Sequence, residues 1–455
     1  MVFKWRGLAA VVVALSVHPL HSQYDKVAAL GSDSAITPIG GPASAPPIST
    51  EPYGLGDLRP TGALNDRLPT WLQFGLDERF RGEDDRDSYL LNRLRVGMIL
   101  QPANWFKAVA QVQDARSFLQ TPAGPPNDVR WDLKLAYAQF GDAEKQRVSV
   151  TVGRQLIDFN NTLIGNSEWR NQARSYDGVV TQVRGNRVRL ALFAASVVNP
   201  LLNGISRHRE GNSVYGAYGW ITRVLPHSSI EPFVLWRVAP LPAGRMSEKA
   251  YGLRVRGTGI ANFDYRYELA LERGGAGSNP IRAWATTGAA GYTLAAYRWR
   301  PRLFAGFDFA SGDRNPAGGV RGTFDTMYPT AHDRFGITDQ FGWQNIVAWR
   351  GGGTVFPHRR WSVTGQYLDL WLASAKDGAY NSSGGLIGRD PTGQSGRHLG
   401  EEFDLYTWYE INRQVHIGSG IGHLLPGTFP ATTGKGTPYT YSYFVIEMFD
   451  GKRIR

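Results

Sequence analysis

Residues 263–272 read FDYRYELALE, and apolar and polar side chains alternate along the stretch. A period of two indicates a β-strand, whose successive side chains point to opposite faces. One face would carry the apolar residues Phe263, Tyr265, Tyr267, Leu269 and Leu271. The other face would carry the charged residues Asp264, Arg266, Glu268 and Glu272. A soluble sandwich would bury the apolar face, whereas a transmembrane barrel would turn it to lipid and turn the charged face to a watery lumen.

The same alternation recurs along the chain between Trp71 and Phe449. Clear examples are the segments 72–81, 93–100, 106–113, 130–137 and 302–309. In 130–137, one face is expected to hold Trp131, Leu133, Leu135 and Tyr137, and the other Arg130, Asp132 and Lys134. Tyr and Trp gather near the inferred strand ends, as in the aromatic girdles of membrane barrels.

Short turns alternate with long polar loops. The segments 101–104 and 184–186 read as short turns, and the long loops are 157–173, 199–212, 312–340 and 376–397. This asymmetry is typical of outer-membrane barrels, which have short periplasmic turns and long outer loops. The sequence therefore predicts an all-β fold, a transmembrane antiparallel barrel of about eighteen strands (16–18), each of ~9–11 residues. A barrel of that size encloses an aqueous lumen.

The composition narrows the class of protein. The 455 residues include no Cys, and the formal net charge is +11. No run of about twenty apolar residues follows the N-terminus, so helical membrane spans are not expected. The absence of Cys excludes thiol catalysis and Cys-based zinc sites, and it suits an oxidising compartment. The basic residues are spread over the whole chain and are mostly Arg, so no nucleic-acid partner is predicted.

The chain ends are expected to differ from the barrel. Residues 1–22 resemble a secretory signal, with Lys4 and Arg6 ahead of an apolar stretch. Residues 23–70 form a segment rich in Pro and Gly that reads as a linker. The barrel is assigned to 71–449 and a C-terminal tail to 450–455.

Several short stretches, in this order along the chain, resemble the alginate-export porin family. They are GRQ at 153–155, LIGNSEW at 163–169, RSYDG at 174–178, FASGDRNP at 309–316, TF at 323–324, YP at 328–329, GAYN at 378–381, GRHLG at 396–400 and GHL at 422–424. The resemblance covers about 71–449. It implies a monomeric eighteen-stranded barrel in the bacterial outer membrane, with an Arg-rich lumen that passes an anionic uronate polymer.

Basic side chains on polar strand faces are the candidate selectivity residues. They are Arg93, Arg95, Arg116, Lys134, Arg154 and Arg174. The family resemblance adds Asp177, because Arg154 and Asp177 match the strand-end positions of the family best. A guanidinium about 4 Å from a carboxylate gains about 1 kcal/mol in bulk water and about 4 kcal/mol at an effective dielectric constant near 20. The alternative is that each cation braces the wall by pairing with a lumen carboxylate such as Asp77, Asp114, Asp132 or Asp177.

No catalytic set stands out, and no enzyme activity, cofactor or metal is predicted. The nine His form no zinc motif. Ser311, Asp313 and Asn315 could hold calcium in an outer loop or simply form a turn. The leading hypothesis is a channel that exports an anionic, alginate-like polysaccharide, with outer-membrane lipid around it and periplasmic polysaccharide-synthesis proteins as candidate partners. A general or small-anion uptake porin is the alternative, and an outer-membrane enzyme or a soluble secreted β protein would be further ones.

Overall fold

The structure is a computed structural model that describes residues 61–120, 127–143, 145–159, 162–202, 204–242, 244–260, 262–330, 332–412, 414–434 and 436–451. The predicted signal sequence at 1–22 lies outside the described residues, as does the Pro-rich segment up to residue 60. Within the described part of the chain, no helix is long and apolar enough to cross a membrane. The two short helices are α1 (Gly62–Asn65) and α2 (Thr428–Thr432).

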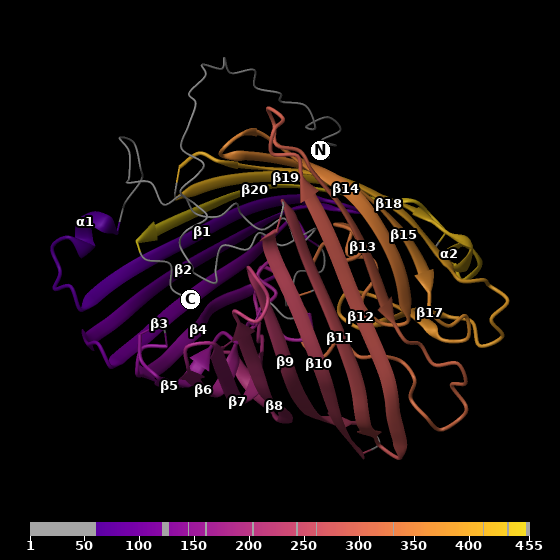
Figure 1. The fold of residues 1–455 in the computed structure, drawn as a ribbon, viewed down its shortest axis with the longest axis horizontal. Helices are drawn as coiled ribbons and strands as arrows, with labels where there is room; N and C mark the ends of the chain where they lie inside the picture. The colour runs from indigo at the N-terminus through magenta and orange to yellow at the C-terminus, as the bar shows by residue number, and fades with distance from the viewer. Residues whose placement is uncertain are drawn as a thin grey trace. The chain divides into compact units, whose positions relative to one another are not determined.

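Eighteen antiparallel strands form one closed sheet (Figure 1). They are β1 (Leu72–Asp84), β2 (Ser88–Ala103), β3 (Phe106–Phe118), β4 (Val129–Phe140), β5 (Val148–Gln155), β6 (Tyr176–Arg184), β7 (Val188–Asn199), β8 (Arg207–Thr222), β9 (Ser228–Leu241), β10 (Gly244–Ile260), β11 (Phe263–Ala276), β12 (Asn279–Thr293), β13 (Arg302–Ala310), β14 (Ile346–His358), β15 (Trp361–Leu372), β18 (His398–Glu410), β19 (Val415–Pro426) and β20 (Tyr439–Gly451). A separate hairpin joins β16 (Gly378–Tyr380) to β17 (Leu386–Arg389).

Each strand pairs with its neighbours along the chain, and β20 returns to pair with β1. That last ladder runs from Gly75 opposite Gly451 to Asp84 opposite Ser442. Closure leaves no unpaired strand edge, which a lipid environment requires. The predicted antiparallel barrel and its count of eighteen strands are confirmed.

The two ends of the barrel differ in their connections. At the end where β1 begins and β20 ends, the longest connection is 294–301. The other end carries all the long ones, namely 119–128, 156–175, 311–345, 373–397 and 427–438. We therefore call the long-loop end the outer end. The predicted long loop at 199–212 is wrong, because β8 begins at Arg207 and leaves only 200–206 between the strands.

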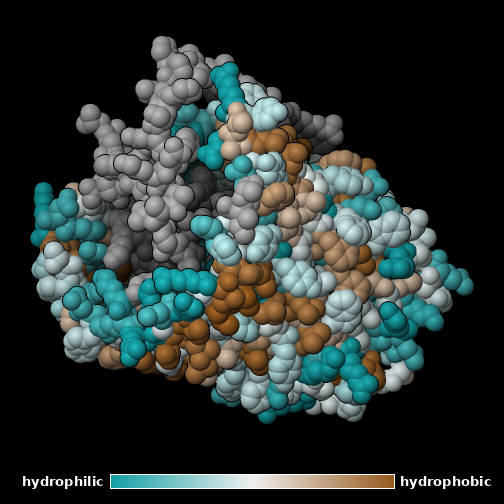
Figure 2. Space-filling view, in the orientation of Figure 1, coloured by the Kyte–Doolittle hydropathy of each residue, from teal (hydrophilic) through white to brown (hydrophobic). Residues whose placement is uncertain are grey.

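The outward face is apolar, as the alternation in β11 predicts. Phe263, Tyr267 and Leu271 are exposed, whereas Glu268 and Glu272 are buried inside the barrel. Figure 2 shows hydrophobic residues gathered across the outward face of the strands that Figure 1 draws in front. In a membrane protein, such a band is the surface that lipid chains cover.

One strand departs from the predicted alternation. In β4, Lys134 and Leu135 are both buried, although they were expected on opposite faces. The ladder with β3 shifts register here, because Leu135 lies opposite Gln111 and Leu133 lies opposite Val112. The shift leaves Lys134 as an extra residue, a β-bulge, and a bulge changes the face on which the following residues lie. Leu135 packs inside the barrel against Ile99 and Val109.

Two long loops fill the inside of the barrel. The loop 156–175 buries Leu163 and Ile164, and the loop 311–345 buries Phe324 and Trp343, in one cluster with inward-facing residues of the wall. The loops also bond to each other, since the amide of Gly165 donates to the carbonyl of Tyr328 at 3.0 Å. These loops bring groups that are distant in sequence to the wall, and the candidate site forms where 156–175 meets β1 and β2.

Candidate functional site in the barrel lumen

Four arginines on two adjacent strands form a cationic cluster on the inner wall. Arg79 and Arg81 come from β1, and Arg93 and Arg95 come from β2; all four are almost completely buried. Arg79 lies directly opposite Arg93 in the ladder. Like charges in such a cross-strand pair repel each other, so the cluster is stable only if it finds acceptors. We call these four residues the arginine cluster.

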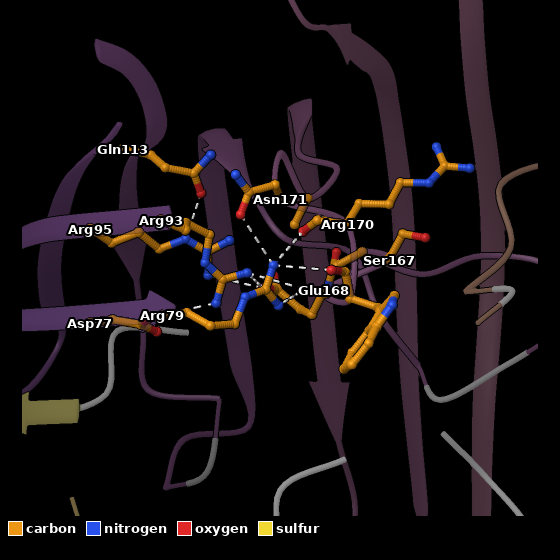
Figure 3. A network of polar contacts seen from close by, with 12 residues as sticks. Asp77, Arg79, Arg93, Arg95, Gln113, Ser167, Glu168, Arg170 and Asn171 are labelled. Atoms are coloured by element: carbon orange, nitrogen blue, oxygen red, sulfur yellow. Dashed lines mark hydrogen bonds and ion pairs between the residues drawn. The ribbon is translucent and has the colours of Figure 1, made fainter. Parts of the chain in front are cut away.

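The carboxylate that contacts both Arg93 and Arg95 comes from loop 156–175. Arg95 Nη1 lies 2.9 Å from Glu168 Oε2, and Arg93 Nη1 lies 3.4 Å from the same oxygen (Figure 3). The side chain of Glu168 nevertheless remains 44% exposed. Burial opposes ionisation of this carboxyl, but the charges of Arg95, Lys134 and Arg93 outweigh burial and hold its pKa well below the usual range. Glu168 is therefore a bound anion at neutral pH.

The loop backbone supplies the remaining acceptors. Arg79 donates to the carbonyls of Glu168 at 2.9 Å, Trp169 at 3.0 Å and Arg170 at 3.1 Å. Arg81 also donates to the Trp169 carbonyl, and its guanidinium lies 4.1 Å from the centre of the Trp169 ring. Among the described residues, neither Arg79 nor Arg95 has a wall carboxylate at ion-pair distance. Their charges are therefore matched chiefly by a loop, not by the rigid sheet.

Lys134 extends the same contact surface. Its ammonium donates to the carbonyls of Ala173 at 2.7 Å and Arg174 at 3.0 Å. The side-chain nitrogen of Asn171 lies within hydrogen-bond distance of three wall and loop carbonyls, those of Asn92, Arg116 and Asn127, and shares its two N–H donors among them. Hydrogen bonds from cationic and amide groups thus hold the segment 168–174 against the inner wall.

The other predicted residues lie apart from the arginine cluster. Arg154 forms a bidentate ion pair with Asp177, with Nε 2.7 Å from Oδ1 and Nη2 3.0 Å from Oδ2. His208 Nδ1 lies 3.1 Å from Asp177 Oδ2. Arg116 pairs with Asp114 at 2.8 Å. Arg174 belongs to the loop itself and donates to the carbonyls of Gly165 and Tyr328, each at 2.7 Å. Arg93, Arg95 and Lys134 are brought together; the selectivity role of all seven residues stays a prediction.

Three important members of the site were not among the predicted residues. Arg79 and Arg81 lie in the alternating segment 72–81, so the pattern that selected Arg93 and Arg95 applies to them equally. Glu168 lies within the LIGNSEW stretch, but its contact with Arg95 spans 73 residues of sequence. No periodicity predicts such a contact, because it depends on how a long loop folds.

On the far side of the lumen, arginines pair with carboxylates of neighbouring wall strands. Arg256 lies 2.7 Å from Glu231, and Arg350 lies 2.9 Å from Asp308. Arg237 lies 2.8 Å from Glu248. These pairs join neighbouring strands, so they brace the sheet. In the arginine cluster, Arg93 and Arg81 also pair with carboxylates of β1, Asp77 at 3.5 Å and Glu83 respectively. Arg79 and Arg95 instead depend on acceptors of loop 156–175.

Further polar groups lie at the outer end. A cavity of about 440 Å³ is lined there by Arg237 on β9, by Arg321 and Asp325 of loop 311–345, and by Arg389 on β17. The carboxylate of Asp313 accepts hydrogen bonds from the backbone amides of Asn315 and Gly322, as expected if this stretch forms a turn. Asp369, His398 and Glu401 come close enough together to hold a metal ion, and they lie on the wall at the outer end.

Comparison with known proteins agrees with this architecture. The sequence model of the alginate export family matches residues 70–440. A search of curated proteins finds no match. The solved structures that resemble the chain include Pseudomonas aeruginosa OccK11 (OpdR), at a TM-score of 0.55 and 13% identity over 84% of this chain and 96% of that one. They also include P. aeruginosa OccK3 (OpdO), at a TM-score of 0.58 and 11% identity over 85% of this chain and 98% of that one. Acinetobacter baumannii OccAB4 has a TM-score of 0.55 and 10% identity over 84% of this chain and 98% of that one.

At these identities the solved structures show the fold alone, which is that of outer-membrane porins. The family match covers most of the chain and confirms the resemblance found in its sequence. Together with the closed barrel of eighteen strands, it identifies a channel protein of the bacterial outer membrane. The chain belongs to the alginate export family.

Proposed function

We propose that this channel exports an anionic, uronate-type polysaccharide and that the arginine cluster is a binding site for the carboxylates of the polymer. The observation that carries the proposal is that the cluster already binds a carboxylate, that of Glu168, at 2.9 Å from Arg95. A site that holds one carboxylate in this geometry has the charge and the donors to hold another.

In this proposal, the polymer reaches the arginine cluster by displacing Glu168. Glu168 is half-exposed and belongs to a loop, so a uronate carboxylate in the lumen can compete with it for Arg93 and Arg95. Transport requires sites that bind each repeat unit but also release it. Competition with a tethered carboxylate supplies that release, because Glu168 rebinds when the polymer moves on.

Single-channel recording in planar bilayers, with uronate oligomers as blockers, tests the proposal. Arg95→Gln should weaken block by at least about fivefold, because a guanidinium beside a carboxylate contributes about 1 kcal/mol even at the dielectric constant of water. Glu168→Gln should strengthen block, because the tethered competitor loses its charge. Arg187→Gln and Glu210→Gln make the same changes at exposed positions and should leave block unchanged.

Two results would count against the proposal. If uronate oligomers fail to block the wild-type channel, it is no uronate pore, and a small-anion porin takes its place. If block occurs but Arg95→Gln leaves it unaltered, the arginine cluster is only a brace for the loop. The direction of transport needs a separate measurement, the amount of polymer released by polymer-producing cells with and without the protein.

A further inference from the structure

A row of three cations crosses the outward face of the barrel on three adjacent strands. Lys249 on β10 lies directly opposite Arg273 on β11, and Arg273 lies directly opposite Arg282 on β12. All three residues are exposed. We call them the cationic row. Trp236 on β9 continues the line, and its ring centre is 5.4 Å from the Lys249 ammonium.

This arrangement carries an electrostatic cost that no carboxylate of the described residues offsets. Like charges placed directly opposite each other on paired strands are destabilising, and here two such pairs follow one another. Among the described residues, no carboxylate lies at ion-pair distance from any member of the row. Arg273 donates to two carbonyls, those of Glu272 at 2.7 Å and Ala283 at 3.3 Å, through a single nitrogen. Most of its donors therefore remain available for an anion.

The row lies at a defined level of the membrane. One step closer to the middle of the wall, the same three strands present Tyr251, Leu271 and Trp284, which lie opposite one another and are exposed. The outward face of β11 is apolar from Leu271 back to Phe263, and the cations begin immediately beyond it. Since β11 leads into a turn at the outer end, the row lies where the apolar band gives way to the headgroups of the outer leaflet.

We infer that the cationic row binds the phosphate groups of a phosphorylated lipid of the outer leaflet. Arg presents donors that fit phosphate in pairs, and Lys adds a compact point charge. Phosphates lie in the headgroup layer, at the level of the row, and their charge relieves the repulsion between the two cross-strand pairs. The inner arginine cluster follows the same logic, with a loop carboxylate in place of the lipid. This inference does not depend on the substrate of the channel.

Retention of lipid tests the inference. The full chain is folded into phosphatidylcholine vesicles that contain bisphosphorylated lipid A, transferred to detergent, and the bound lipid A is counted by native mass spectrometry. The wild-type protein should retain lipid A. The triple variant Lys249→Gln, Arg273→Gln, Arg282→Gln should retain far less, because each basic residue near a charged lipid surface is worth roughly a fivefold difference in affinity.

Two controls separate the row from general charge and from acyl-chain contacts. The variant Arg187→Gln, Arg223→Gln, Arg298→Gln removes three exposed arginines from the short turns at the opposite end and should retain lipid A like the wild type. Lipid A without its phosphates should be lost from the wild-type protein. The single variant Arg273→Gln gives a readout if the triple variant does not fold, as judged by heat-modifiable migration.

If the triple variant retains as much lipid A as the wild type, the inference is overturned. Where the triple variant does not fold, equal retention of lipid A by Arg273→Gln and the wild type overturns it. So would equal retention of lipid A with and without phosphates. Block by uronate oligomers should be the same in the triple variant and the wild type, because the row faces away from the lumen. If uronate oligomers fail to block the wild-type channel while the wild type retains lipid A and the triple variant does not, the proposed function fails and this inference stands.

Discussion

Asp333, in the loop 311–345, is a buried carboxyl group without a compensating contact. Its side chain is almost completely buried, and neither of its oxygens has a hydrogen-bond partner among the described residues. Burial raises its pKa to about 7, although His332 and Arg350 favour the charged form; Asp404 and Asp339 add to the rise. The group therefore changes charge near neutral pH, inside a loop that fills the lumen.

We expect Asp333→Asn to stabilise the protein more at pH 8 than at pH 5. The folded chain keeps the proton up to about pH 7, whereas the unfolded chain releases it near 3.8. The contribution of Asp333 to wild-type stability is therefore most favourable at low pH and is lost as the pH rises toward 7. Asn removes this loss, worth about 1–3 kcal/mol for a buried polar group without partners, and tolerates the backbone φ of 59°. The temperature at which the folded, heat-modifiable band disappears on a gel, recorded for both proteins at each pH, measures the effect. An equal rise of this temperature at pH 5 and pH 8 would contradict the expectation.

The candidate site was only partly predictable at the residue scale. Arg93, Arg95 and Lys134 could be selected because charged side chains on an inward face follow from the period of a strand. Glu168 could not, since its place beside Arg95 depends on the path of a loop. Whether a lumen cation pairs with the wall or with a loop likewise depends on the folded loops, as the contrast between Arg256 with Glu231 and Arg95 with Glu168 illustrates.

Strands were the most predictable elements, because each has a buried and an exposed face. In β11 the alternation gives the correct face for Phe263, Leu271 and Glu272. In β4 it fails after Leu133, where the bulge at Lys134 inserts an extra residue. The bulge coincides with bonds from Lys134 to two loop carbonyls. A sequence pattern within one strand contains no information about such partners.

Position along β11 should decide the cost of a charge on its outward face. Leu269→Arg places a guanidinium near the middle of the membrane and should cost about 2–4 kcal/mol, whereas Phe263→Arg, at the short-turn end, should cost about 0–1 kcal/mol. Urea titration of protein folded into lipid vesicles measures both. Equal costs would mean that this face of β11 does not span the apolar layer.

At the scale of the whole molecule, the barrel is a rigid wall around loops that occupy its interior. The wall is held by continuous ladders between all neighbouring strands. The loop 156–175 is held by cation-to-carbonyl bonds, by Glu168 and by the burial of Leu163 and Ile164 against the wall. The length and topology of the chain predict the wall, but the filling of the lumen requires the loop contacts themselves.

Replacing 163–174 by a short Gly/Ser connection should leave the barrel folded and increase its conductance. The deletion removes the loop acceptors of Arg79, Arg95 and Lys134, while Arg93 keeps Asp77. Anion preference at low salt should therefore rise, because fixed positive charge favours anions in a narrow pore. At 1 M salt the preference should weaken, since the screening length falls to about 3 Å. Reversal potentials measure the preference. Deleting 391–396 from the outer loop is the matched control, and an identical change in both deletions would contradict the expectation.

The pairing of β1 with β20 also bears on how the protein is made. The seam joins Gly75 to Gly451, so the first strand of the barrel lacks its second partner until the last of the eighteen strands has been delivered. Until then both margins of the growing sheet offer unsatisfied amides and carbonyls to any neighbouring chain. Such a late, long-range contact makes assembly slow and vulnerable to association between copies. A chain that ends before β20 cannot form this seam, so the barrel closes only when every strand is present.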